Sequence, residues 1–338
     1  MSMYYDYDKL LSRDFLIAFV ITERGLGKTF GAKKAVLNRW LKAGEEFIYV
    51  RRYKTELDSS LATFWSDLQN NGYFEDYELK VKKSKLLTKF TCNGKVCGYA
   101  VPLSTSNILK STAFPKVKYI VFDEYLLAQG GTYRYLKNEI TLFLDLIETV
   151  FRLRDGKVLM LGNALNVYAS PYFAYWDLDI PYGKEFQSYK NGAILVNYAR
   201  NDEYREVKRK TKFGALIDGT DYGRMSIDNE DISMNHLFVQ KKPENSRFMA
   251  VLIINGNKIG IWLGKDGYMY LSDKYEPNTS NKFAFDFTDH TESTIFTSVR
   301  ENLHVHACVE AYKHGWLKFE NERVKANAIS LLNRCISF

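Results

Sequence analysis

The sequence predicts an α/β protein in which a domain with a mainly parallel sheet is followed by a smaller α+β domain. In the first 200 residues, short apolar runs alternate with helical patterns, which is typical of strands that are buried on both faces. After residue 229 the pattern changes to short strands with hairpin turns, and two helical patterns follow. We therefore expect a first domain over residues 1–200, a linker region over 201–228 and a second domain over 229–338.

The first buried strand, predicted at Phe15–Ile21, runs directly into a glycine-containing loop. Gly25 and Gly27 permit a tight turn whose N–H groups point inward. Lys28 can then reach the β- and γ-phosphates of a nucleotide, and the Thr29 hydroxyl can ligate Mg²⁺. The residues that this pattern assigns to nucleotide binding are Thr22, Glu23, Arg24, Gly25, Leu26, Gly27, Lys28 and Thr29.

This loop departs from the usual GxxxxGK[ST] pattern, because Thr22 stands where the first glycine is expected. The alternative is a chance glycine turn ahead of an amphipathic helix, which the pattern predicts over Lys28–Leu41. Strand, loop and helix nevertheless follow one another in the required order. Because a helix N-terminus adds partial positive charge behind bound phosphates, this order favours a nucleotide site.

The composition excludes some classes of protein. With 46% hydrophobic and 26% charged residues, the chain has the profile of an ordinary soluble globular protein. Its first residues lack the apolar segment of a signal peptide, and no apolar run is long enough to cross a bilayer. The formal charge of +7 is modest, so it supports nucleic-acid binding only together with local basic patches. The four cysteines lack the paired spacing of a metal site, and we expect reduced thiols.

A second strand, predicted at Glu46–Arg52, brings Arg51, Arg52 and Lys54 to a strand end, where ligands bind in open α/β sheets. A helix is expected from about Glu56 to Gln69. The next predicted parts are an antiparallel insertion of hairpin strands over Tyr77–Pro102 and a loop over Ser104–Lys116 that carries Lys110.

A third buried strand, predicted at Tyr119–Glu124, ends in two adjacent carboxylates. Asp123 can hold the water shell of Mg²⁺, while Glu124 can polarise a water for in-line attack on a γ-phosphate. One carboxylate cannot serve both purposes well, because metal ligation removes its basicity. The alternative is a strand that merely ends in solvated acids, and the phosphate loop about a hundred residues upstream disfavours it.

A loop with Arg134 and Lys137 precedes an amphipathic helix predicted over Asn138–Arg152. The fourth buried strand, predicted at Lys157–Leu161, is followed by a glycine and by Asn163. An amide at this strand end can hydrogen-bond a γ-phosphate or the attacking water. An ordinary turn asparagine is an equally good reading from this stretch alone.

The last third of the chain begins with a fifth strand, predicted at Ala193–Tyr198, and a basic run over Glu203–Phe213. This run is either a solvated helix face or a contact to phosphates. The second domain has the pattern of an RNase H-like module, yet its strands over Met249–Asn255 and Lys258–Leu263 contain no aspartate. Because two-metal cleavage of phosphodiesters needs converging carboxylates, we expect no nuclease activity.

Several motifs together resemble the large-terminase and viral DNA-packaging ATPases. They are a deviant phosphate loop with an arginine four residues before its lysine, a strand ending in Asp-Glu and a strand ending in Gly-Asn. Stretches over nearly the full chain are similar to the encapsidation ATPase of the small protein-primed podophages, the phi29-like group. In the order of that family, these stretches are EFIYVRRYKTEL, IVFDEY, ETVFRLR, SPYF, KRKTKFG, LIDGTDYG and MAVLIINGNKIGIWL.

The resemblance implies an additional-strand P-loop ATPase domain and a vestigial RNase H-like domain. It also implies ATP and Mg²⁺ as ligands, and a homopentameric ring that docks at the portal vertex of an empty prohead and drives double-stranded DNA inside. The expected location is the host cytoplasm, with no membrane contact and no place in the mature virion. Some relatives contact a structural RNA at the portal, and the sequence does not indicate whether this chain does.

By the same resemblance, Lys28 and Thr29 match the Walker A residues, and Asp123 and Glu124 match the metal residue and catalytic glutamate of Walker B. The other matches implied by the family are Arg24 as the terminase phosphate-loop arginine, Asn163 in the coupling motif, Arg152 as the arginine finger toward the neighbouring subunit, Lys54 as a basic residue at that interface and Lys110 as a pore residue facing DNA. DNA contacts by Arg134 and Lys137 are less well supported, because their loop carries less charge than in the relatives. The finger role stays open between Arg152, Arg154 and Lys54.

Three alternatives remain at this point. One is a terminase with an active nuclease, which the strands without aspartate disfavour. Another is a non-hydrolysing nucleic-acid-binding or structural protein with a decayed loop, which the pairing of Asp123 with Glu124 disfavours, because a dead site has no need of the second carboxylate. A small-molecule P-loop kinase would leave the second domain without a use.

Overall fold

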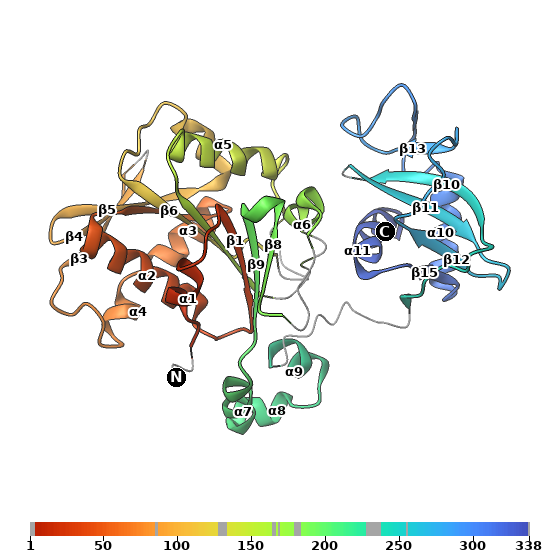
Figure 1. Cartoon of the computed structure of the whole chain (residues 1–338). Helices are drawn as coiled ribbons and strands as arrows, with labels where there is room; N and C mark the ends of the chain where they lie inside the picture. Colours follow the sequence, from red (N-terminus) through yellow and green to blue (C-terminus); the bar gives the residue numbers. More distant parts are fainter. Residues whose placement is uncertain are drawn as a thin grey trace. The chain divides into compact units, whose positions relative to one another are not determined.

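The chain is described by a computed structural model that covers residues 4–84, 87–127, 134–163, 167, 170–178, 184–227, 238–254 and 256–336. It divides into two compact units (Figure 1). The first unit, called unit 1, consists of Met1–Leu165 and Asp179–Asp231, and unit 2 consists of Asn166–Leu178 and Ile232–Phe338. Unit 1 thus includes the whole stretch predicted as a linker, and a short segment before residue 179 groups with unit 2.

The described part of unit 1 is built on one sheet of nine strands, in the order β3-β4-β5-β2-β6-β7-β1-β9-β8. The strands from β5 to β9 in this order pair in parallel, whereas β3, β4 and β8 are added antiparallel at the two edges. The mainly parallel sheet predicted from the sequence is confirmed. The strands are β1 (Ile17–Thr22), β2 (Glu46–Arg51), β3 (Leu79–Lys82), β4 (Thr88–Cys92), β5 (Lys95–Pro102), β6 (Val117–Asp123), β7 (Lys157–Asn163), β8 (Phe186–Tyr189) and β9 (Ile194–Ala199).

Strand β7 lies between β1, which leads into the glycine loop, and β6, which ends at Asp123. Its register places Thr22 opposite Asn163 on one side and Asp123 opposite Leu161 on the other. This is the additional-strand arrangement. Because the three strands are parallel, their carboxyl ends meet at one edge of the sheet, where ligands bind in open α/β folds.

Helices cover both faces of this sheet, which explains why its strands are almost continuously apolar. On β6, Tyr119 and Val121 face the core that includes Val36 of α2, whereas Phe122 faces the other way and lies 6.0 Å, between ring centroids, from Phe143 of α5. The helices that precede β8 in unit 1 are α1 (Tyr7–Leu11), α2 (Lys28–Ala43), α3 (Lys54–Leu61), α4 (Ser66–Gln69), the 3-10 helix η1 (Leu103–Leu109) and α5 (Glu139–Phe151).

The prediction of a single helix from about Glu56 to Gln69 is wrong, because α3 ends at Leu61 and α4 begins at Ser66. Neighbouring residues of a continuous helix point about 100° apart. The break lets Phe64 and Trp65 enter the same aromatic cluster, with ring centroids 4.2 Å and 5.3 Å from that of Phe90. Burial of two adjacent aromatic side chains therefore outweighs helical continuity.

The described residues of the predicted linker form three short helices within unit 1. They are α7 (Asp202–Lys210), α8 (Lys212–Ile217) and α9 (Asp221–Ser226), and they follow β9 in the chain. The 3-10 turn η2 (Lys190–Gly192) precedes β9. We call this stretch the helical segment. Helix α7 begins with Asn201 as its N-cap, whose side chain accepts a hydrogen bond from the Tyr204 N–H at 3.0 Å.

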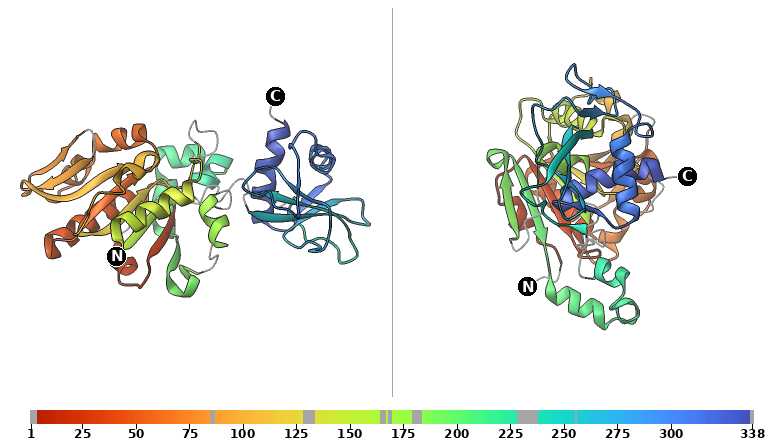
Figure 2. Two further views of the ribbon diagram at one scale, coloured as in Figure 1. Left: turned by 90° about the horizontal axis from the view of Figure 1, so that it is seen from above. Right: turned by 90° about the vertical axis from the view of Figure 1, so that its right-hand side faces the viewer.

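Unit 2 contains a second sheet (Figure 2). Its strands follow the order β14-β13-β10-β11-β12-β15. The antiparallel meander β10-β11-β12 matches the predicted hairpin strands, whereas β13, β14 and β15 pair in parallel. Helices α10 and α11 share a hydrophobic core with this sheet. The elements are α6 (Pro171–Trp176), β10 (Arg247–Ile254), β11 (Asn257–Leu263), β12 (Met269–Ser272), β13 (Lys282–Ala284), β14 (Ile295–Phe296), α10 (Leu303–Lys313), β15 (Leu317–Phe319) and α11 (Glu322–Ile336).

The pattern of short strands after residue 229 also includes residues 238–242, and there the prediction is wrong, because this stretch makes only an isolated bridge between Val239 and Phe319. Strand β15 has three residues, so it offers little edge for another strand. The hairpin turn that the Asn255-Gly256 pair predicts lies partly outside the described residues. No helix among those described is both long and apolar enough to cross a membrane. Cys92, Cys97 and Cys308 are buried free thiols.

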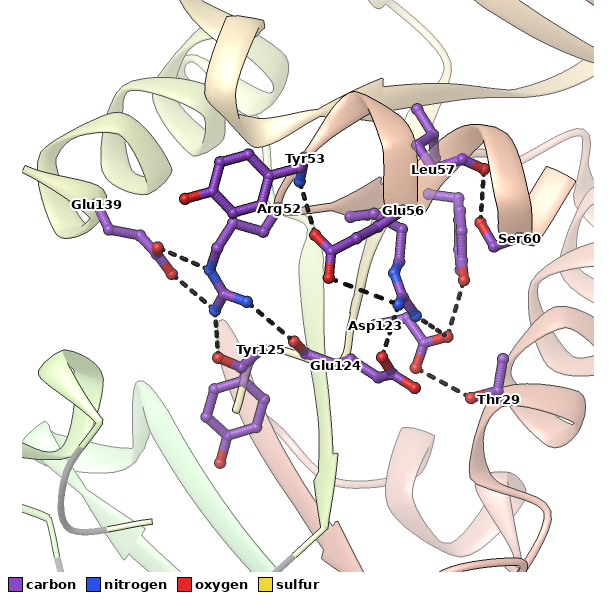
Figure 3. Close-up of polar contacts among 12 residues, drawn as sticks. Thr29, Arg52, Tyr53, Glu56, Leu57, Ser60, Asp123, Glu124, Tyr125 and Glu139 are labelled. Atoms are coloured by element: carbon purple, nitrogen blue, oxygen red, sulfur yellow. Dashed lines mark hydrogen bonds and ion pairs between the residues drawn. The ribbon is translucent and has the colours of Figure 1, made fainter. Parts of the chain in front are cut away.

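A buried ion pair joins Arg52, the residue after β2, to Glu139 of α5. Arg52 is 1% exposed, and its Nε donates to Glu139 Oε2 at 2.8 Å. Its Nη2 also donates to the Tyr125 carbonyl at 2.5 Å, and its Nη1 to the Glu124 carbonyl at 3.4 Å (Figure 3). Arg52 therefore holds the backbone directly after β6.

Replacing Glu139 by alanine should lower the free energy of unfolding by about 3–5 kcal/mol, because it leaves the buried Arg52 charge without its carboxylate. Urea denaturation measures this change. Glu185→Ala, which breaks an exposed pair with Lys9, is the matched control and should change the stability little. Equal losses in the two variants would contradict the assigned importance of the buried pair.

Candidate nucleotide-binding and catalytic site

The loop between β1 and α2 has the backbone that its glycines predict. Gly25 and Gly27 have φ angles of +94° and +80°, which residues with a Cβ rarely adopt. Gly27 is the N-cap of α2, so the loop ends at a helix N-terminus, where an anion is stabilised. Thr22 and Leu26 are buried, and the Thr22 hydroxyl donates to the Glu23 carbonyl at 2.9 Å.

Tyrosines near the N-terminus hold this loop from outside. The Tyr5 N–H donates to the Leu26 carbonyl at 3.0 Å, and the Tyr7 hydroxyl donates to the Lys28 carbonyl at 2.7 Å. The Tyr4 ring lies against Gly27, at 3.1 Å from where a Cβ would be. In the sequence, Tyr4, Tyr5 and Tyr7 belong to a tyrosine-rich leader before the first strand, and they could either stack on a base or lie on the surface. Tyr5 and Tyr7 instead support the loop.

Lys28 and Asn163 meet at the carboxyl edge of the sheet. The Lys28 ammonium is 2.5 Å from Asn163 Oδ1, although the two residues are 135 positions apart in sequence. Burial lowers the pKa of Lys28, and the charges of Asp123 and Glu124 offset part of that effect. The amide oxygen of Asn163 therefore accepts a hydrogen bond from the Lys28 ammonium at the position where a phosphate oxygen would bind.

Asp123 lies beside the Thr29 hydroxyl, which donates to its Oδ1 at 3.0 Å (Figure 3). Its other oxygen accepts from the Tyr49 hydroxyl at 2.8 Å and from Arg51 Nη1 at 3.4 Å. Thr29 and Asp123 thus present two oxygen atoms of the kind that Mg²⁺ prefers. The pKa of Tyr49 is raised by its burial and by the Asp123 charge, so it stays a proton donor.

Glu124 follows β6 with a φ angle of +55°, which is uncommon for a residue with a long side chain. Its carboxylate is 2.6 Å from Arg51 Nη2, and its side chain is 58% exposed. Although burial alone would lower the pKa of Arg51, the charges of Asp123, Glu124 and Glu56 raise it, so the guanidinium stays charged. Arg51 therefore binds both carboxylates at the end of β6.

The three basic residues proposed as trans-acting fingers differ clearly. Arg154 donates to four backbone carbonyls, at 2.5 Å to 3.2 Å, and is thereby tied within its own chain. Lys54 pairs with Asp58 of its own helix at 2.6 Å. Arg152 is exposed at the C-cap of α5, with a φ angle of +52°. This geometry favours Arg152 as the residue that can extend from the surface.

The residues predicted to contact DNA are exposed. The Lys110 ammonium pairs with Asp145 Oδ2 of α5 at 2.8 Å, so an approaching phosphate would compete with this carboxylate. Arg134 and Lys137 are also exposed, and the stretch 128–133 before them lies outside the described residues.

The comparison with known proteins decides the family. A family model described as "Podovirus DNA encapsidation protein (Gp16)" matches residues 1–336. The DNA packaging proteins of Bacillus phages PZA and phi29 are 36% and 35% identical over 336 residues, covering 98% of this chain and 98% of each relative. The chain belongs to the podovirus DNA encapsidation protein family.

Solved structures of this family agree with the fold. A chain of the bacteriophage phi29 viral genome packaging motor assembly matches with a TM-score of 0.77 and 32% identity, over 99% of this chain and 100% of that chain. The crystal structure of the N-terminal domain of the phi29 DNA packaging ATPase matches 60% of this chain and 99% of that domain, with a TM-score of 0.53 and 37% identity. The podovirus encapsidation fold therefore extends over both units.

Several residues at this site were not singled out by sequence reasoning. Tyr49 belongs to the continuous apolar run of a buried strand, and Arg51 was placed at the strand end without a partner. Arg205 was part of a basic run predicted to be solvated or to contact phosphates. It is instead 8% exposed and pairs with Glu23 of the loop at 2.6 Å. No apolar face in the sequence marks Arg205 as buried, because Val207, the aliphatic residue of this helix, is 45% exposed.

Proposed function

We propose that this encapsidation protein is an ATP-driven translocase that packages double-stranded viral DNA into a preformed prohead. The observation that supports this most is the meeting of Lys28, Thr29, Asp123 and Asn163 at the carboxyl edge of the sheet. Membership of the encapsidation family supports the packaging role. The hydrogen bonds from Thr29 to Asp123 and from Lys28 to Asn163 join residues that are 94 and 135 positions apart in the chain. A decayed nucleotide loop would not keep such hydrogen bonds.

In this proposal, different side chains carry out different parts of ATP hydrolysis. The loop N–H groups and Lys28 bind the phosphates, while Glu124 orients the attacking water. Thr29 and Asp123 would hold Mg²⁺, which offsets charge on the phosphates when bound. Asn163 releases Lys28 to the γ-phosphate and so responds to whether that phosphate is present.

We further propose that subunits form a ring, by family analogy a pentamer, at the portal of the prohead. Arg152 of one subunit reaches the ATP of its neighbour, and Lys54 lies at the same interface. Lys110, Arg134 and Lys137 contact DNA phosphates. The protein acts in the host cytoplasm, without nuclease activity, and leaves the capsid before the virion matures. A structural RNA is a further partner to be tested at the portal.

The test measures ATP hydrolysis and nuclease-protected DNA with purified protein, proheads and double-stranded DNA. Lys28→Ala should abolish both, because the phosphates lose their only loop lysine. Lys42→Ala, at the exposed far end of the same helix, is the matched control and should leave both intact. Packaging that persists in Lys28→Ala would overturn the proposal, and plasmid nicking by the wild type would favour a terminase with an active nuclease.

A further inference from the structure

The loop that is proposed to bind phosphates contains a carboxylate of its own. Glu23 is 0% exposed, and it stands between Thr22 at the end of β1 and Gly25 in the turn. A buried negative charge in this loop opposes the binding of an anion such as ATP unless a cation compensates it. The fate of the Glu23 charge therefore matters for the affinity of the site.

The compensating cation comes from the helical segment. Arg205 of α7 lies 182 positions later in the chain, and its Nε donates to Glu23 Oε1 at 2.6 Å. The Asn201 N–H at the start of the same helix points to that oxygen at 3.3 Å. The carboxylate thus faces both a buried guanidinium and the positive end of a helix.

Two more side chains of α7 contact the same loop. The Tyr204 hydroxyl and the Lys208 ammonium donate to the Arg24 carbonyl at 3.3 Å and 3.0 Å. A Cβ on Gly25 would lie 2.2 Å from the Tyr204 hydroxyl oxygen, so α7 occupies the space beside the turn. Lys208 also donates to the Ser226 carbonyl at 2.6 Å, which ties the loop to the end of α9.

We propose that Arg205 is a positioning residue for ATP binding, because it neutralises Glu23 and so keeps the loop receptive to phosphates. The inference rests on the proposed function, since it concerns the same nucleotide site. It extends that site to α7, a helix with no residue in the Walker motifs. The binding of ATP and the attachment of the helical segment are then linked through one buried ion pair.

Isothermal titration of the full-length chain with ATP tests this inference. Arg205→Ala should raise the dissociation constant about tenfold or more, because it leaves the Glu23 carboxylate without its cation. The double variant Glu23→Ala/Arg205→Ala removes both charges and should return to within about threefold of the wild type. Arg209→Ala removes a partly exposed arginine from the same helix, paired with Asp218, and should bind ATP like the wild type.

The outcomes are distinct. Equal weakening in the single and double variants would mean that Arg205 acts only through packing, and unchanged affinity in Arg205→Ala would equally overturn the inference. If Arg205→Ala does not fold, Arg205→Lys and the double variant carry the test, and a tenfold loss in either overturns it. If the wild type bound ATP no better than the Lys28→Ala variant does, the proposed function itself would be overturned.

Discussion

Replacing Glu124 by glutamine should lower ATP turnover by about 10²- to 10⁴-fold while ATP still binds, because the amide cannot polarise the attacking water. The carboxylate lies directly after Asp123 and is the exposed member of the pair. The positive φ angle at Glu124 turns its side chain away from the path of β6. Such strain persists only where the surroundings impose it, here through the Arg52 contacts to the carbonyls of Glu124 and Tyr125.

The measurement is single-turnover hydrolysis together with ATP affinity. Glu56→Gln is a matched isosteric control, because Glu56 also approaches Arg51, at 3.9 Å, from helix α3. This control should keep most of the turnover. A similar loss in both variants would mean that Arg51, and not the attacking water, is the group that needs the carboxylate.

Replacing Arg152 by alanine should reduce turnover of the assembled ring by about 10³- to 10⁵-fold, the range that arginine fingers supply in comparable enzymes. An isolated subunit should be slow already and change little. Arg154→Ala is the informative neighbour. Because Arg154 binds four carbonyls of its own chain, its loss should lower the melting temperature, and the folded fraction should keep the ring-stimulated activity.

Mixing subunits tests whether Arg152 acts across an interface. Rings of Glu124→Gln alone or of Arg152→Ala alone should both be inactive. Mixed rings should recover part of the activity, because some interfaces then combine an intact Glu124 with an intact neighbouring Arg152. No recovery at any ratio would place Arg152 in its own subunit's site or in a structural role.

The sheet and most of the candidate site follow from local patterns. Apolar runs of the length of a strand predict β1, β6 and β7, and their order predicts that Lys28, Asp123 and Asn163 converge, because parallel strands share a carboxyl edge. The structure brings these residues together. Their catalytic roles remain predictions.

The contacts that escaped prediction join distant segments. No periodicity relates Glu23 to Arg205, and composition alone made the latter one of many surface cations. The sequence likewise does not distinguish Arg152 from Arg154. Only the geometry at the end of α5 decides which of the two guanidinium groups hydrogen-bonds to backbone carbonyls of its own chain. The break between α3 and α4 depends on the aromatic cluster around Phe90, which no local propensity records.

The position of β1 has a consequence for biosynthesis. Its two neighbours, β7 and β9, pair with it through residues such as Val158 and Ile194, so both of its edges stay open on the ribosome while more than a hundred further residues are made. Pairings of such high sequence separation form slowly and leave apolar strands exposed meanwhile. Arg205 emerges later still. The nascent chain therefore cannot complete this candidate nucleotide site until Arg205, about three-fifths of the way along the chain, has been translated.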